Sequence, residues 1–167
     1  MAPPTDRLFT LAQSFLDQIV AGWPGDAEPL PDRQYVSNGL VVWDCCEQLA
    51  VQVERTYGIE GDVTGETVIT KGVGFAMRAA TVAITLLRFQ PDLADEGDSV
   101  VIPSAQEIDD GAAVLLGDAT ALLNVIVAAQ KAGDLVNCDS LAFEDWNSQG
   151  PEAGIGGGIL RVRAALL

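Results

Sequence analysis

The sequence contains no histidine, and its 167 residues include only nine lysines and arginines against 24 aspartates and glutamates. The lack of histidine excludes a Ser-His-Asp triad, a His-paired cysteine nucleophile and every zinc site that has a histidine ligand. Nine cations do not suffice for the usual basic surface, so the formal net charge of −15 disfavours sequence-specific binding of DNA or RNA. An anionic membrane surface is disfavoured for the same reason.

Cysteine is also scarce, with Cys45 and Cys46 adjacent and Cys138 far away. The chain has no CxxC pair, and an odd number of cysteines is not a disulfide framework. Cys45 alternates with apolar residues, which favours a small buried hydrophobic side chain over a reactive thiol. We therefore expect reduced thiols, in a protein that works or is assembled in a cytoplasm.

The sequence has neither a recognisable targeting signal nor a long hydrophobic run. Residues Met1–Arg7 lack a basic stretch followed by a long apolar run, so no signal peptide is expected. The most apolar segment, Ala112–Ala129, is interrupted by polar residues and glycine, and no stretch reaches the ~18 apolar residues of a membrane span. We expect a soluble, intracellular product.

What is present suits one globular domain over residues 1–167. Hydrophobic residues make up 49% of the chain, too many for a disordered acidic tail.

A first helix is predicted near the start of the chain, with Thr5 or Asp6 as its cap. Its apolar residues Leu8, Leu11, Phe15 and Ile19 recur at helical spacing, and Gly22–Gly25 ends it.

Strand patterns follow the first helix. A short strand is expected near Gln34–Val36, and a turn at Ser37–Gly39. Two long strands are predicted at Leu40–Tyr57 and Phe75–Phe89 by alternating apolar residues and β-branched content. Their connection, Gly58–Gly74, is too long for a tight turn and predicts a long β-hairpin arm.

A second helix is predicted to begin at Ser104, with Glu107 completing a capping box, and to end at Gly133. Ile108, Leu115, Ala119, Leu122 and Ile126 form its apolar stripe. A short strand, Leu141–Trp146, and a glycine-rich turn, Gly150–Gly158, then lead to a last strand, Ile159–Leu166.

The order helix, strands, helix, strands predicts an α+β fold. We expect a mainly antiparallel β-sheet whose consecutive strands are joined by hairpins, with two α-helices packed on one face and the long β-hairpin arm.

Catalytic and ligand-binding motifs are weak. The run Gly154–Gly158 precedes a strand and lacks a lysine, so it is interpreted as a turn or bulge and not as a phosphate loop. The acids Asp92, Asp95, Glu96 and Asp98 do not have the spacing of a calcium loop, and Asp109–Asp110 suits the dipole of a helix start. No nucleophile or oxyanion motif accompanies any carboxylate pair, so we expect no enzyme, no cofactor and no metal site.

Arg161 and Arg163 alternate along one face of the last strand. Two interpretations remain open: a solvated outer face of the sheet, or salt bridges across a subunit boundary, where arginine is favoured for bidentate pairing.

The order of elements resembles the tail terminator proteins of long-tailed phages with flexible tails. The resemblance rests on the helix Thr5–Ala21, the paired strands Leu40–Tyr57 and Phe75–Phe89, and the helix Ser104–Ala132. It extends to the closing unit, in which Leu141–Trp146, a glycine-rich turn and Gly158–Arg163 follow one another. The abundance of Ala, Val, Gly and Asp is also similar to that of virion proteins from phages of high-GC actinobacteria.

The resemblance implies a structural virion protein at the head–tail junction, assembled in the host cytoplasm. Such a protein forms a ring, usually of six subunits, that caps the tail tube and stops its polymerisation. Its partners would be further copies of itself, the tail-tube protein and the head-completion (stopper) protein, and DNA would pass through without specific binding. Arg161 and Arg163 are then candidate inter-subunit contacts, and Gly61, Asp62, Glu66 and Lys71 of the arm are candidate partner contacts. The alternatives are another connector component, a tail-tube subunit, an acidic binding module or a small enzyme.

Overall fold

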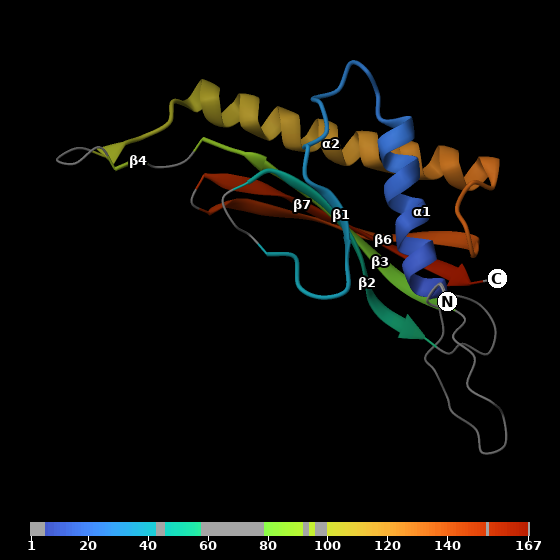
Figure 1. The fold of residues 1–167 in the computed structure, drawn as a ribbon. Coiled ribbons are helices and arrows are strands. Elements are labelled where there is room, and N and C mark those ends of the chain that lie inside the picture. Colours follow the sequence, from blue (N-terminus) through green and yellow to red (C-terminus); the bar gives the residue numbers. More distant parts are fainter. Residues whose placement is uncertain are drawn as a thin grey trace, which may run out of the picture.

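A computed structural model describes residues 6–42, 46–57, 79–91, 94–95, 100–152 and 154–166. Five of its strands form one sheet in the order β1-β2-β3-β7-β6, and a separate short ribbon joins β4 to β5. Figure 1 shows α1 and α2 on the same side of the five-stranded sheet, which confirms the predicted α+β class. The elements are α1 (Arg7–Gly22), β1 (Gln34–Ser37), β2 (Gln48–Tyr57), β3 (Ala79–Phe89), β4 (Ala94–Asp95), β5 (Val100–Val101), α2 (Ala105–Ala132), β6 (Cys138–Glu152) and β7 (Ile155–Leu166).

The sheet is antiparallel except at one edge. β1 runs parallel to β2, with Gln34 opposite Leu49, so the expectation that hairpins join all consecutive strands is wrong there. A parallel pair needs a connection that carries the chain back to its starting end, and the described residues 38–42 and 46–47 belong to that connection. The Gln48 side chain holds that connection in place. Its Nε2 donates to the backbone carbonyl of Val42 at 2.6 Å, and its Oε1 accepts from the Tyr35 hydroxyl at 2.8 Å.

The predicted strand boundaries need correction at two places. β2 begins at Gln48 and not at Leu40, which is 93% exposed, because the apolar alternation continues into a connection. β6 is much longer than the predicted Leu141–Trp146. Trp43 and Cys45 lie outside the described residues, as do residues 75–78 of the predicted partner strand and the predicted arm at 58–74.

The glycine-rich segment is mostly strand. The turn between β6 and β7 is tight: Glu152 pairs with Ile155, and Gly154 has a positive φ of 78°. Gly157 and Gly158 lie within β7, and a Cβ at Gly158 would come within 2.0 Å of the Trp146 ring. These glycines therefore serve close packing as well as chain reversal.

The core lies between the helices and the sheet. The buried residues of α1 include Leu11, Phe15 and Ile19, as its predicted stripe requires. The predicted apolar face of β7 is buried as well, at Leu160 and Val162. The same cluster includes Leu49, Val51, Val82, Ile84, Leu86, Leu122 and Ile126.

α2 is buried along only part of its length. All its buried residues lie at or after Asp118, including Leu122 and Ile126 of the predicted stripe. Ile108 belongs to the same predicted stripe, yet 54% of it is exposed. The prediction is wrong for Ile108, because helical periodicity identifies an apolar face without showing how far along the helix the core extends.

The ends of α2 are as predicted. The Ser104 hydroxyl accepts from the Glu107 amide at 3.2 Å, and the Glu107 carboxylate accepts from the Ser104 amide at 2.8 Å. The Glu107 carboxylate also accepts from the Ser104 hydroxyl at 2.8 Å. The hydrogen bonds to this carboxylate, first from the Ser104 backbone amide and then from the hydroxyl, hold the pKa of Glu107 below its ordinary value of 4.5. Gly133 ends the helix with a φ of 78°, in the left-handed conformation that glycine favours.

The capping box predicts a measurable stability effect at Ser104. Ser104→Ala should lower the free energy of unfolding by about 1 kcal/mol at pH 7, measured by urea denaturation. Because the pKa of Glu107 is lowered in the folded state, its contribution is present above pH 4.5 and is lost as pH falls further. Ser104→Ala keeps the backbone amide that donates to Glu107 and loses the hydroxyl that also donates to it, so the difference between wild type and Ser104→Ala should shrink in part below pH 4.5. A difference that does not change with pH would show that the Ser104 hydroxyl does not donate to the Glu107 carboxylate.

Candidate functional site

The sheet face opposite the helices carries a cluster of charged side chains. Because β7 alternates, its buried residues Leu160 and Val162 face the helices, and Arg161 and Arg163 project from the other face, as predicted. Three acids meet the two arginines: Glu54 from β2, and Glu144 and Asp145 from β6. We call these five residues the ion-pair cluster.

Arg161 is the centre of the ion-pair cluster. Its Nε lies 2.9 Å from Glu54 Oε2 and its Nη2 lies 3.2 Å from Oε1, which is a bidentate pair across β3. Asp145 Oδ2 accepts from Nη1 at 3.4 Å. The hydrogen bonds that Arg161 donates to Glu54, more than any other contact, raise the pKa of Arg161. Its side chain is 25% exposed, so the pair is partly shielded from solvent.

Arg163 is held by a different pair of groups. Its guanidinium forms an ion pair with Glu144 and stacks over the Tyr57 ring, 5.2 Å from the centroid. Tyr57 is fixed in turn by a hydrogen bond of 3.2 Å between its hydroxyl and that of Thr81. A cation over an aromatic face is stabilised by the ring quadrupole.

Two strand irregularities lie at the glutamates of the cluster. The register of β2 against β3 shifts between Val53 and Arg55, and Glu54 is the residue left out of the pairing. The register of β6 against β7 shifts between Phe143 and Asp145, where Glu144 is left out. Glu54 follows Val53, which packs against the core, so alternation places Glu54 on the arginine face. At the bulge in β6 two successive side chains lie on one face, so Glu144 and Asp145 both reach the arginines. Strict alternation would send Glu144 and Asp145 to opposite faces, which is why their pairing could not be predicted.

The arginines thus have carboxylate partners within their own chain. The role of Arg161 and Arg163 as inter-subunit contacts stays a prediction, and intramolecular pairing accounts for their geometry without it.

A double-mutant cycle measures the intramolecular pair. Arg161→Ala and Glu54→Ala should each lower stability slightly, and their coupling energy should not exceed about 1 kcal/mol, since the pair is bidentate but only partly shielded from solvent. Chemical denaturation of the two single variants and the double variant gives this value. A coupling near zero would show that Arg161 does not depend on Glu54 in solution.

A second ion pair lies inside the core and was not anticipated from the sequence. Arg88 of β3 donates from Nε to Asp118 Oδ2 at 2.9 Å and from Nη2 to Oδ1 at 3.0 Å, and the two side chains are only 3% and 2% exposed. The same guanidinium donates to the backbone carbonyls of Glu28 and Pro29. Arg88 therefore joins β3, α2 and the connection after α1.

An apolar groove borders the exposed half of α2. It has a volume of about 520 Å³, and its walls come from the start of α2, from the end of β3 and from the β6–β7 turn. The residues at its edge are among the most exposed large hydrophobic residues of the described chain. The lining residues are Gln90, Pro91, Ile102, Pro103, Ile108, Ala112, Leu115, Leu116, Ser148, Gln149, Gly150 and Pro151.

Other predicted site residues fall outside the described part. Gly61, Asp62, Glu66 and Lys71 of the predicted arm lie there, and so do Asp92, Glu96 and Asp98 of the acidic stretch considered for calcium. Among the residues that the structure does describe, no group of three or more acids and cysteines is arranged to hold a metal ion.

The chemistry of the remaining features is limited. Burial raises the pKa of the Cys138 thiol to about 11, with a smaller contribution from Asp139, so this cysteine is a protonated thiol at neutral pH and a poor nucleophile.

By length and composition the helix α2 could cross a membrane, contrary to the expectation from sequence, and 39% of its most apolar stretch is buried in the fold. The core helix of a folded domain meets the same criterion.

Comparisons with known proteins do not assign the chain to a family. No protein-family model matches the sequence, and no curated protein matches it.

Proposed function

We propose that this chain is a structural virion protein: a tail terminator that forms a ring on the last tier of the tail tube, stops its polymerisation and joins it to the head. The observation that carries the proposal is the succession of elements. A first helix, a paired β2 and β3, one long helix and the closing hairpin of β6 and β7 follow one another. This is the order on which the resemblance to tail terminators rests.

The two edges of the sheet support ring formation. β6 is the last strand on one side, and on the other side β1 covers only Leu49–Gln52 of β2. Two different edges on opposite flanks of one subunit are what a head-to-tail, closing contact requires. An isologous dimer would need one self-complementary surface.

The charge of the chain supports a role around DNA without binding it. A ring of subunits that each carry a formal charge of −15 repels phosphate, so DNA can pass through its channel without being retained. We place part of this acidic surface toward the channel.

Mass measurement tests the proposal first. The purified protein, alone and mixed with the tail-tube protein encoded by the same phage, should form a ring detectable by native mass spectrometry and by negative-stain microscopy. A strict monomer at all concentrations, with no ring on tube protein, would contradict it.

Deletion from the phage is the sharper test. Without this protein, tails should be of abnormal length and should fail to join heads. Tails of normal length that still join heads would show that the chain is not a terminator.

A further inference from the structure

The first half of α2 presents apolar side chains that the core of its own chain does not cover. Ile108 is 54% exposed and Leu116 is 63% exposed, and Ile102, just before the helix, is 74% exposed. All three line the apolar groove described above. A gathering of exposed large hydrophobic residues in one hollow is typical of a surface that contacts a partner.

The walls of the groove are held in place by the fold. A Cβ at Gly111 would lie 2.5 Å from Gln90 Oε1 and 3.2 Å from Pro91 Cδ, so α2 passes very close to the end of β3. The Gln90 amide donates from its backbone to the carbonyl of Gly154 at 2.8 Å, which ties the end of β3 to the β6–β7 turn. The groove is therefore formed before any partner arrives, which lowers the entropic cost of binding.

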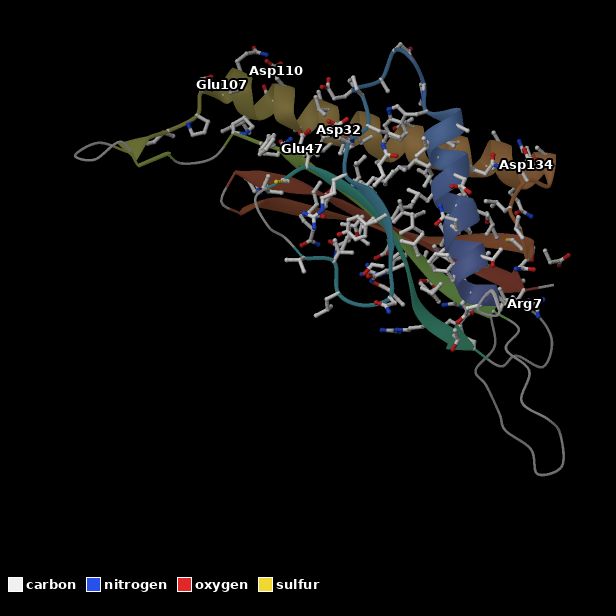
Figure 2. The ribbon with its side chains drawn as sticks, viewed as in Figure 1. Arg7, Asp32, Glu47, Glu107, Asp110 and Asp134 are labelled. Carbon is white, nitrogen blue, oxygen red and sulfur yellow. The ribbon has the colours of Figure 1, made fainter. Side chains whose placement is uncertain are left out.

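Acidic side chains flank the apolar stripe of α2. In an α-helix of about 3.6 residues per turn, Ile108, Ala112 and Leu116 form one stripe. Glu107 lies on one side of this stripe and Asp109 lies on the other. Figure 2 shows Glu107 together with Asp110 at this end of α2, and Asp134 at the far end. The sequence has no lysine or arginine between Pro91 and Gln130. The groove is thus apolar at its centre and negative along its borders.

This charge pattern restricts the occupant. A second copy of the chain is a poor match, because the protein has only nine cations and three of them, Arg88, Arg161 and Arg163, are held by its own carboxylates. An anionic lipid surface would be repelled by the acids. Complementarity calls for apolar side chains bordered by lysine or arginine.

We propose that the acid-flanked apolar groove at the start of α2 docks an amphipathic segment of a different protein, one whose apolar face is bordered by basic residues. This inference goes beyond the proposed function, because it concerns a partner other than this chain and does not require a ring.

A pair of designed peptides tests the proposal on the full-length protein. The first is a helical 14-mer with leucines on one face and lysines along both borders, and the second has glutamate in place of each lysine. In a ¹⁵N NMR titration, the basic peptide should shift the amide signals of Ile108, Ala112, Leu116 and Gly150. The acidic peptide should bind at least about tenfold more weakly, and added salt should reduce the difference.

Substitutions at exposed positions identify the site. Ile108→Ser with Leu116→Ser should weaken binding of the basic peptide about tenfold or more, since both apolar anchors are removed. Asp109→Lys should weaken it as well, whereas the matched control Asp134→Lys makes the same change of net charge just beyond the far end of α2 and should have little effect. Circular dichroism confirms that each variant is folded.

Four outcomes would overturn the proposal. Equal binding of the two peptides would remove the charge argument, and signal shifts confined to other surfaces would remove the site. Self-association that Ile108→Ser abolishes would make a second copy the occupant. Binding to phosphatidylcholine vesicles through the groove would make it a lipid surface. The three outcomes other than self-association leave the proposed ring untested, since they concern only what this groove binds.

Discussion

Replacing Asp118 by alanine should lower the free energy of unfolding by about 3–5 kcal/mol, a large part of the stability of a domain of this size. The substitution leaves the Arg88 guanidinium, which is 3% exposed, without its carboxylate in the core. A buried charge without a partner is costly because neither water nor an opposite charge compensates it. Urea denaturation followed by tryptophan fluorescence measures the loss.

Two further variants separate the ion pair from simple packing. Asp134→Ala removes an exposed carboxylate at the other end of α2 and should change stability by less than about 0.5 kcal/mol. The double variant Arg88→Met with Asp118→Leu removes both charges and should recover most of the loss, because apolar residues of similar size often replace a buried ion pair at little cost. A loss below about 1 kcal/mol for Asp118→Ala would show that water reaches Arg88.

The same pair should control local structure near α1. Arg88 donates to the carbonyls of Glu28 and Pro29, which belong to the connection between α1 and β1. In Arg88→Met these carbonyls lose their donor, so amide hydrogen exchange should accelerate around this connection more than in the centre of β3. Uniform acceleration over the whole chain would indicate a global loss of stability instead.

Element types could be predicted from the sequence because they depend on local patterns. Helical spacing and caps identified both helices, and Gly133 marked the end of α2 as the structure has it. Alternation identified the faces of β7 correctly, including the side on which Arg161 and Arg163 lie. These features depend on residues within a few positions of one another.

The site contacts could not be predicted, because they depend on residues far apart in the chain. Asp118 looked like an interruption of an apolar helix, and only the packing of α2 on β3 brings it to Arg88. Glu144 and Asp145 reach the arginines together through a register shift that no alternation pattern encodes. The exposed start of α2 has the same origin: the apolar spacing continues through Ile108, but the buried part of the helix begins at Asp118.

The glycines of β7 provide the second large effect, and Gly157 is the sharpest case. A Cβ at Gly157 would lie 2.1 Å from the Leu86 carbonyl oxygen and 3.0 Å from Leu87 Cα, both of which are backbone atoms of β3. Side chains can rotate away from such a collision, but the backbone of a central strand has to shift. Gly157→Ala should therefore lower stability by about 3 kcal/mol, as overpacking of a filled interior does.

The same substitution at Gly117 provides the matched control, with an expected effect of opposite sign. Gly117 lies in the interior of α2, is exposed, and a Cβ there would meet no atom within 4 Å. Gly117→Ala should raise stability by about 1 kcal/mol, because alanine loses less backbone entropy than glycine on entering a helix. Chemical denaturation of both variants measures these changes in the free energy of unfolding. If Gly157→Ala does not lower stability, the glycines of β7 are not required for the close approach of β7 to β3.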